Sequence, residues 1–204
     1  MNGAPQPGDI VILNGAPRSG KSSIVAAIQE TCDGVWINLG VDLARRMTPP
    51  RLQPGIGLRP GEDDHHAAPY VPRLYAALYD SVAAHSRLGL NVAVDVGHYD
   101  AAILADAARR LDGLPVLFVG VRCPIDVIKE RRRASEAGRS VTPAEDEPIP
   151  GAVLRWQDQV HGDWDYDLEL DTSQLSPAEC ATAINARLED RSAARAFAAL
   201  ISET

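Results

Sequence analysis

Lysine is scarce in this chain: of 20 Lys and Arg residues, only Lys21 and Lys129 are lysines. Asp and Glu together number 28, so the formal net charge is −8 at pH 7. Nucleic-acid binding depends on clustered cations that neutralise phosphates, so this balance excludes nucleic acid as the expected partner. A nucleotide can still bind, provided that backbone amides and a few well-placed cations hold it.

Long apolar runs, aromatic residues and cysteines are also few. No apolar stretch reaches the roughly 18 residues of a membrane-spanning helix, and the N-terminus lacks a signal-peptide pattern, so we expect no membrane association. Aromatic residues make up 5% of the chain, so Val, Ile, Leu and Ala must form the core. The cysteines, Cys32, Cys123 and Cys180, are odd in number and form no Cys-x-x-Cys pair. We expect free thiols in a reducing, cytoplasmic compartment.

What the chain does contain is a regular alternation of short β-branched runs with longer Ala-rich helical stretches. This alternation predicts parallel strands with right-handed crossovers in a three-layer α/β domain. The expected strands are residues 10–14, 35–38, 91–95, 116–121 and 167–171. The expected helices are residues 22–31, 70–87, 101–111 and 124–136, with one or two more within 178–201. These last helices either cover the sheet or pair subunits into a homo-oligomer.

Two segments interrupt the alternation within what we expect to be a single domain spanning residues 1–204. Residues 48–69 are rich in proline and contain the run Glu-Asp-Asp-His-His, and residues 137–151 are rich in proline and acidic residues. Loops of this length inside a compact domain are typically lids or binding loops. We therefore predict a substrate loop over about residues 48–69 and a lid over about residues 131–151.

The strongest motif is the sequence GAPRSGKS at residues 15–22, which matches G-x-x-x-x-G-K-[ST]. Its glycines let the backbone turn tightly, so that successive amides and the following helix N-terminus face one anion. Lys21 is then expected to reach the β- and γ-phosphates of ATP or GTP, and the Ser22 hydroxyl to bind Mg²⁺. The predicted nucleotide-binding residues are Gly15, Ala16, Pro17, Arg18, Ser19, Gly20, Lys21, Ser22 and Ser23.

Three acidic residues fall where predicted strands end, at the edge where doubly wound sheets bind ligands. Asp95 closes the third strand, where an acidic residue typically faces the metal, and it could also contact substrate. Asp42 lies just beyond the second strand, where a carboxylate can bind the acceptor and take the proton of its attacking hydroxyl. For both, the alternative is a helix-capping role. Asp171, at the end of the fifth strand, is better explained by capping.

Arginine and histidine side chains give weaker signals. Arg131 and Arg139 are the candidates to close over the γ-phosphate as part of a lid, and their neighbours at 132 and 133 fit a solvated helix face. Arg18 points either to solvent or to substrate. His98, three residues after Asp95, is a candidate substrate contact, and the alternatives are a supporting position behind the site or a position on the surface. The histidine pair at 65–66 fits a solvated loop better than a metal site.

Several stretches together resemble the chloramphenicol phosphotransferase family of P-loop kinases. They are residues 12–15 with the phosphate loop, 39–42 (LGVD), 119–123 (VGVRC) and 164–172 (WDYDLELDT). The resemblance implies a P-loop NTPase fold with a mainly parallel five-stranded sheet flanked by helices, and phosphorylation of a primary hydroxyl on an antibiotic. It also implies that Asp42 is the general base.

The sequence departs from that family at two places. The family's paired aspartates after the third strand appear here as Asp95-Val96, so one carboxylate is missing. The proline-rich loop after Met47 also differs from the family's substrate region. The resemblance therefore supports the family better than it supports chloramphenicol as the substrate.

These observations predict an NTP-dependent O-phosphotransferase that acts on a small hydroxyl-bearing molecule, in the manner of an antibiotic-modifying kinase. A kinase of a primary metabolite, such as a sugar or nucleoside, is the nearest alternative. A regulatory nucleotide switch that reads guanine through Asn-Lys-x-Asp is not expected, because no lysine follows Lys129. A non-catalytic nucleotide-binding module remains a further alternative.

Overall fold

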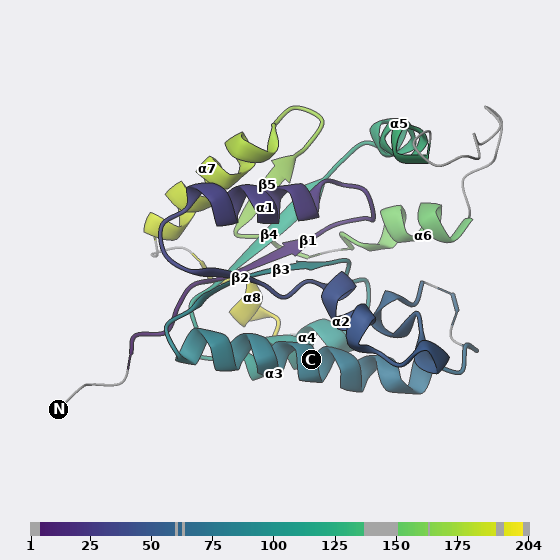
Figure 1. Cartoon of the computed structure of the whole chain (residues 1–204), viewed down its shortest axis with the longest axis horizontal. Coiled ribbons are helices and arrows are strands. Elements are labelled where there is room, and N and C mark those ends of the chain that lie inside the picture. The colour runs from purple at the N-terminus through teal and green to yellow at the C-terminus, as the bar shows by residue number, and fades with distance from the viewer. Residues whose placement is uncertain are drawn as a thin grey trace.

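A five-stranded sheet runs through the molecule with helices on both faces (Figure 1). The computed structural model describes residues 5–59, 61–62, 64–136, 151–162, 164–190 and 194–201. The strands are β1 (Ile10–Asn14), β2 (Trp36–Asn38), β3 (Asn91–Val96), β4 (Val116–Arg122) and β5 (Leu168–Asp171). The helices are α1 (Lys21–Thr31), α2 (Val41–Met47), α3 (Val71–Arg87), α4 (Ala101–Arg110), α5 (Ile125–Glu136), α6 (Gly151–Gln159), α7 (Pro177–Glu189) and α8 (Ala196–Ala199). Short 3-10 turns occur at Pro50–Leu52, Gly55–Gly57 and Ala68–Tyr70.

The strand order is β2-β3-β1-β4-β5, and each pairing is parallel. The central strand β1 lies between β3 and β4, with Leu13 opposite Asp95 on one side and Val119 on the other. The carboxyl ends of β1 and β3 therefore lie side by side, and the segments that follow them face the same edge of the sheet. This arrangement confirms the predicted parallel α/β fold.

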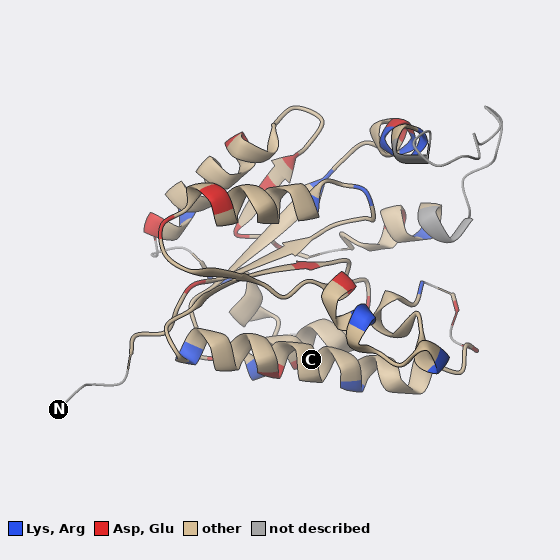
Figure 2. Cartoon of the chain, viewed as in Figure 1, with Lys and Arg blue, Asp and Glu red and all other residues tan. Residues whose placement is uncertain are grey.

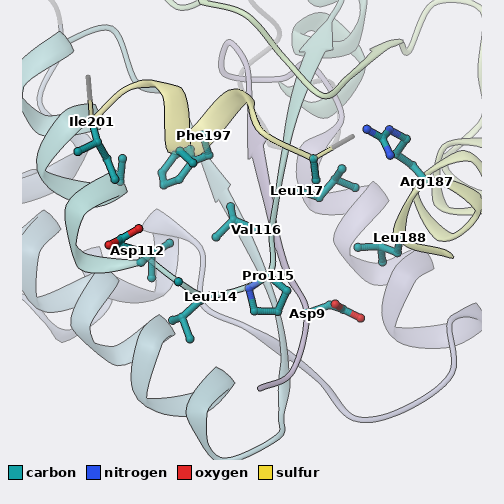
Figure 3. A pocket seen from close by; sticks show the side chains of 15 residues that line it. Asp9, Asp112, Leu114, Pro115, Val116, Leu117, Arg187, Leu188, Phe197 and Ile201 are labelled. Carbon is teal, nitrogen blue, oxygen red and sulfur yellow. The ribbon is translucent and has the colours of Figure 1, made fainter. Parts of the chain in front are cut away.

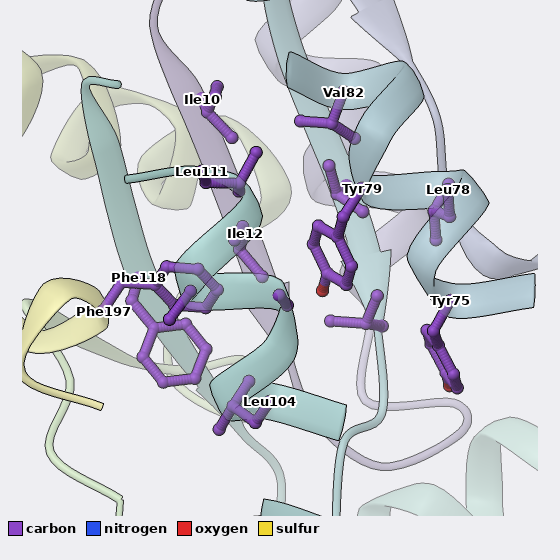
Figure 4. Close-up of a cluster of buried hydrophobic side chains, with 14 of the residues drawn as sticks. Ile10, Ile12, Tyr75, Leu78, Tyr79, Val82, Leu104, Leu111, Phe118 and Phe197 are labelled. Atoms are coloured by element: carbon purple, nitrogen blue, oxygen red, sulfur yellow. The ribbon is translucent and has the colours of Figure 1, made fainter. Parts of the chain in front are cut away.

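The core has two halves, one on each face of the sheet. Ile10 and Ile12 of β1 face the side covered by α3 and α4, where Phe118 packs edge-on against Phe197 of α8 (Figure 4). The intervening residues of β1 face α1 and α7. Because alternate side chains of a strand point to opposite faces, both sets are buried, which explains the uninterrupted apolar run. Burying each such Ile contributes about 1.5–3 kcal/mol.

Charged residues lie mainly on helices and loops, and the strands carry few (Figure 2). Asp95 is an exception, because it lies within β3 and is only 7% exposed. A carboxylate buried at this depth is costly unless a ligand, a cation or hydrogen-bond donors compensate it. Its position at the ligand-binding edge of the sheet indicates a functional reason.

Two helices were not predicted. Residues 39–42 were expected to be a loop after β2, yet α2 begins at Val41, and α6 follows the predicted lid. Each residue of α2 is at least partly exposed, so this short helix buries no complete apolar face that periodicity could reveal. The four helices predicted from 22–31 to 124–136 and the five strands agree with the structure to within one residue at each end.

Candidate active site

The phosphate loop, residues 15–22, turns sharply between β1 and α1. Arg18 and Gly20 have left-handed backbones, with φ of 69° and 101°, and such turns direct successive amides into one hollow. A side chain at Gly15 would come within 2.5 Å of the Val121 carbonyl oxygen, so glycine is required there. Gly20 is the N-cap of α1 and carries no side chain that could cap the first helical amides, which leaves them open to an anion.

The loop opens onto a cavity of about 1150 Å³ at the carboxyl ends of β1 and β3. Among the predicted nucleotide-binding residues, Ala16 and Ser19 are buried and do not line the cavity, whereas the other residues do. One end of the cavity is formed by Thr172, Leu175 and Pro177. The other end is formed by α2 and the proline-rich loop. Their residues that line the cavity include Asp42, Arg45, Pro54, Gly57, Arg59, Glu62 and His65.

Lys21 reaches back across the loop that precedes it. Its Nζ donates to the carbonyl oxygens of Gly15 and Ala16, both at 2.8 Å. Burial lowers the pKa of Lys21 to about 8, although the charges of Asp95 and Asp42 act in the opposite direction. The ammonium therefore lies within the electrostatic field of both carboxylates, and all three residues line the cavity.

Ser22 and Asp95 form the candidate metal site. The Ser22 Oγ donates to Asp95 Oδ2 at 2.6 Å, so a hydroxyl and a carboxylate oxygen already meet at one point. Within the part of the chain that the structure describes, no ion pair includes Asp95. A side chain at Gly40 would overlap Asp95 Oδ1, so glycine is needed where the backbone between β2 and α2 passes this carboxylate.

Asp42 lies in the first turn of α2, and its carboxylate lines the same cavity as Asp95. The side chain is 63% exposed and forms an ion pair with Arg45 Nη2 at 3.5 Å. An exposed pair of this kind contributes at most about 1 kcal/mol, so it leaves Asp42 free to move toward a ligand. Asp42 is thus placed where an acceptor hydroxyl could approach the phosphates, while Asp171 lies on β5 away from this end.

Arg131 links α5 to the phosphate loop and to the end of β5. Its Nη2 donates to the Thr172 carbonyl oxygen at 2.6 Å, and its Nη1 donates to Thr172 Oγ1 at 3.1 Å and to the Arg18 carbonyl oxygen at 3.4 Å. Thr172 Oγ1 in turn donates to the Ser19 carbonyl oxygen at 2.6 Å. The guanidinium therefore connects the phosphate loop to Thr172 through hydrogen bonds. Arg131 also lines the cavity.

The remaining predicted arginines fall into two groups. Arg139 lies outside the described residues, as does most of the predicted lid. Arg18 lines the cavity, and so does Arg132, which had been expected on a solvated helix face.

His98 does not line the cavity. It is 2% exposed, and its Nε2 lies 2.6 Å from the Tyr79 hydroxyl, while its ring packs on Tyr75 at a centroid distance of 4.7 Å. Burial lowers the pKa of His98 to about 3, so the imidazole is neutral. Its backbone amide also donates to Asn14 Oδ1 at 2.7 Å. His98 therefore packs against α3 and does not face the cavity.

Other cavity residues were missed by the sequence analysis. Trp156 of α6 lines the cavity although it follows a segment expected to be a loop, and Arg45 and Arg59 line it beside Asp42. No motif marks Trp156 or Arg45, whereas Arg59 lies within the predicted substrate loop of residues 48–69. Thr172 lies within the stretch that carried the family resemblance, which was the available signal for it.

A second cavity, of about 150 Å³, lies at the opposite edge of the sheet (Figure 3). It is lined by Asp9 and Pro115, which precede β1 and β4, and by apolar residues of α4, α7 and α8 such as Phe197. This is the amino edge of the strands, away from the phosphate loop. Its small volume and mainly aliphatic lining do not suit a nucleoside triphosphate.

Within the described residues, no helix has both the length and the apolar character needed to cross a bilayer. Those residues also contain no group of three or more His, Cys, Asp or Glu side chains arranged to hold a metal ion.

Comparison with known proteins identifies the family of this chain. The family model "Chloramphenicol phosphotransferase-like protein" matches residues 8–189. A protein of Mycobacterium tuberculosis (strain H37Rv) that bears the provisional name of an O-phosphotransferase is 28% identical over 195 residues, which cover 89% of this chain and 82% of that protein.

Solved structures with a similar fold include kinases. The APS kinase of Mycobacterium tuberculosis, in complex with AMPPNP and APS, has a TM-score of 0.64 at 19% identity and covers 91% of this chain and 99% of its own. A gluconokinase from Sinorhizobium meliloti 1021 has a TM-score of 0.59 at 21% identity, with coverages of 91% and 94%. At these identities the likeness shows the fold alone. With the family match, it follows that the chain belongs to the chloramphenicol phosphotransferase-like family and is a phosphotransferase of the P-loop kinase type.

Proposed function

We propose that this chain transfers the γ-phosphate of ATP or GTP, bound with Mg²⁺, to a hydroxyl group of a small molecule. The observation that carries the proposal is the contact of 2.6 Å between Ser22 Oγ and Asp95 Oδ2, in the same cavity as Lys21 and Asp42. Phosphoryl transfer needs a phosphate cradle, a metal site and an acceptor-side base in one place. All of these groups lie at one edge of the sheet.

The residues present suit magnesium. Ser22 supplies a hydroxyl oxygen and Asp95 a carboxylate oxygen, and Mg²⁺ prefers oxygen ligands from few protein groups. When bound, the ion would offset negative charge on the β- and γ-phosphate oxygens. Asp95 also orients the Ser22 hydroxyl through their hydrogen bond. The two oxygens then lie close enough together to bind one metal ion, as the sequence predicts.

Asp42 is proposed to accept the proton of the acceptor hydroxyl. The hydroxyl oxygen then forms a bond to the γ-phosphorus, the bond from that phosphorus to the β–γ bridging oxygen breaks, and the nucleoside diphosphate leaves. Lys21 stays protonated and neutralises the phosphate oxygens. To reach them, its Nζ must give up its hydrogen bonds to the carbonyl oxygens of Gly15 and Ala16. General-base assistance of this kind contributes about 10²–10⁴-fold to the rate.

For the nucleoside, the cavity end formed by Thr172, Leu175 and Pro177 offers an apolar wall. The Arg131–Thr172 hydrogen bonds hold this wall against the phosphate loop. We propose that Arg131 positions the loop through these bonds and, together with Arg139, contributes positive charge near the γ-phosphate.

Two classes of acceptor alcohol are candidates, an antibiotic and a polar metabolite. Family membership supports an antibiotic acceptor, with resistance as the outcome. The polar acceptor end, with Arg45, Arg59 and Glu62, supports a polar metabolite such as a sugar or nucleoside. A transfer assay with γ-labelled ATP or GTP and both classes of alcohol separates them. A protein that binds nucleotide but labels no alcohol in such a panel is a binding module and contradicts the proposal.

A further inference from the structure

The acceptor end of the cavity contains one feature that the proposed reaction does not use, the indole of Trp156 on α6. Among the cavity-lining residues in the described part of the chain, it is the one that carries a benzenoid ring. Apart from the polar imidazole of His65, the other lining residues near the acceptor end are small, aliphatic or charged, such as Val41, Asp42 and Arg59. The flat apolar surface offered to an acceptor therefore comes from Trp156.

The indole is held in a defined orientation. Its Nε1 donates to the Gly97 carbonyl oxygen at 3.0 Å, and its ring meets Tyr99 edge-on at a centroid distance of 6.0 Å. A side chain at Gly97 would come within 2.9 Å of Nε1, so glycine makes room for the ring. The helix itself is fixed by Gln157 Nε2, which donates to the Cys123 carbonyl oxygen at 2.8 Å. A ring held in this way binds a ligand with little loss of conformational entropy.

The position of Trp156 places it on the acceptor side of the phosphates. Its partner Gly97 lies two residues after Asp95, and a side chain at Gly97 would also lie 3.2 Å from the Gly15 carbonyl oxygen at the start of the phosphate loop. On the other flank, the Tyr99 hydroxyl donates to the Leu58 carbonyl oxygen at 3.5 Å, within the proline-rich loop. The indole thus lies between the phosphate loop and that loop, whereas the apolar nucleoside wall lies at the other end of the cavity.

Polar groups accompany this surface. Asp42, Arg45, Arg59 and Glu62 line the same end, and His65 Nδ1 accepts a hydrogen bond from the Ala67 amide at 3.1 Å. In a neutral His65 the proton must then reside on Nε2, which makes that nitrogen a donor. A flat apolar face combined with hydrogen-bonding groups suits a ring that has apolar faces and a polar edge.

Building on the proposed phosphotransferase function, we propose that Trp156 is the ring-binding surface of the acceptor site and that the acceptor carries its hydroxyl on or next to a ring. The shared chemistry is a flat ring face with apolar character, as sugars and cyclitols present through C–H groups and arenes through their π-systems. Trp156 acts as a specificity residue: it lowers the KM of cyclic acceptors and takes no part in the transfer of the proton or the phosphoryl group.

The test compares matched cyclic and acyclic alcohols in the labelled transfer assay. Glucose against sorbitol represents saturated rings, and benzyl alcohol against hexanol represents arenes. The wild-type protein is expected to phosphorylate the cyclic member of one pair with a kcat/KM about tenfold higher. The pair that shows the preference identifies the kind of ring. Equal kcat/KM values within both pairs would overturn the inference.

Two substitutions make the test specific. Trp156→Leu removes the ring and is expected to raise the KM for the preferred cyclic alcohol about tenfold, with the KM for its acyclic partner and the nucleotide Kd unchanged. Trp156→Phe keeps a ring but loses the hydrogen bond to Gly97, and is expected to retain most of the cyclic preference. An unchanged cyclic preference in Trp156→Leu would contradict the inference.

Fluorescence keeps the inference testable if Trp156→Leu does not fold. In the double variant Trp36→Phe/Trp164→Phe, Trp156 is the one tryptophan left of the three in the chain. Its emission should change when the cyclic alcohol is added and should not change with the acyclic one. An unchanged emission with a cyclic alcohol that is demonstrably phosphorylated would overturn the inference. Nucleotide binding without transfer to any alcohol would instead overturn the proposed function, so the two failures are distinguishable.

Discussion

The two ends of the cavity are built in different ways. The nucleotide end is formed mainly by one continuous segment, residues 15–22. The glycines of this segment allow the turn that directs its backbone amides toward the phosphates. The acceptor end is assembled from side chains of α2, the proline-rich loop and α6, which are far apart in the sequence. A phosphate site made of backbone amides therefore fixes the identity of few side chains, whereas a substrate site made of side chains can change without altering the fold.

Lys21 gives the largest expected effect at the nucleotide end. Lys21→Ala removes the charge that neutralises the phosphates and should lower kcat/KM at least about 10³-fold. Lys129→Ala is the matched control, because Lys129 forms an exposed pair with Asp126 on α5 and should keep wild-type activity. Steady-state transfer assays on both variants measure the difference. Equal activity of the two variants would remove Lys21 from the mechanism.

At the acceptor end, Asp42→Asn keeps the side-chain shape but cannot accept the hydroxyl proton. We expect kcat to fall about 10²–10⁴-fold while the nucleotide Kd stays at the wild-type value. Asp33→Asn, at an exposed position outside the cavity, controls for the loss of one negative charge. Turnover close to wild type in Asp42→Asn would show that another group is the base.

Gly40 tests the contact between the two ends, because its backbone passes beside Asp95. In Gly40→Ala the new methyl group would overlap Asp95 Oδ1, so the carboxylate must turn away and its bond to Ser22 weakens. The Mg²⁺ concentration for half-maximal activity should rise about tenfold, as is typical when the support of a metal site is lost. In Gly57→Ala the nearest atom to the new methyl lies 3.4 Å away, so its Mg²⁺ dependence should be unchanged. An unchanged Mg²⁺ dependence in Gly40→Ala would argue against Asp95 as a metal ligand.

The smallest expected effect is in the pH dependence of nucleotide binding. Burial lowers the pKa of Lys21 to about 8 in the free protein, and bound phosphates favour the charged form. Below this pH the ammonium is already present, so the affinity should be constant. Above it, binding must take up a proton, and the affinity should fall by up to about tenfold per pH unit. Calorimetric titration across this range measures the slope.

The control for this pH effect is Lys21→Arg, whose guanidinium stays protonated throughout. If it folds and binds nucleotide, its affinity should not fall in the same range. A wild-type affinity that stays constant well above pH 8 would contradict the low pKa of Lys21.

The same contrast explains what could be predicted from the sequence. The strands and the phosphate loop were predictable because each depends on local pattern: the apolar run of β1 is buried on both faces, and the glycines at 15 and 20 meet backbone constraints. The prediction of a shared metal site at Ser22 and Asp95 followed from the motif and from the end of β3, and the structure brings these two side chains into contact.

Tertiary contacts limited the rest. His98 looked available because it follows β3, but Tyr75 and Tyr79 of α3 enclose it, and no pattern near residue 98 indicates that contact. Trp156 enters the cavity because α6 is anchored to the ends of distant strands. Such placements arise from packing between segments that are separated in the chain, which local periodicity does not encode.

The most direct test of the account is mass spectrometry of an acceptor incubated with this protein, Mg²⁺ and nucleoside triphosphate. We predict that the acceptor gains one phosphoryl group for each nucleoside diphosphate formed, and that Lys21→Ala forms neither product. Nucleoside diphosphate that appears at the same rate with and without every candidate alcohol, with no gain in acceptor mass, would contradict the assignment of a phosphate cradle and an acceptor site to one cavity.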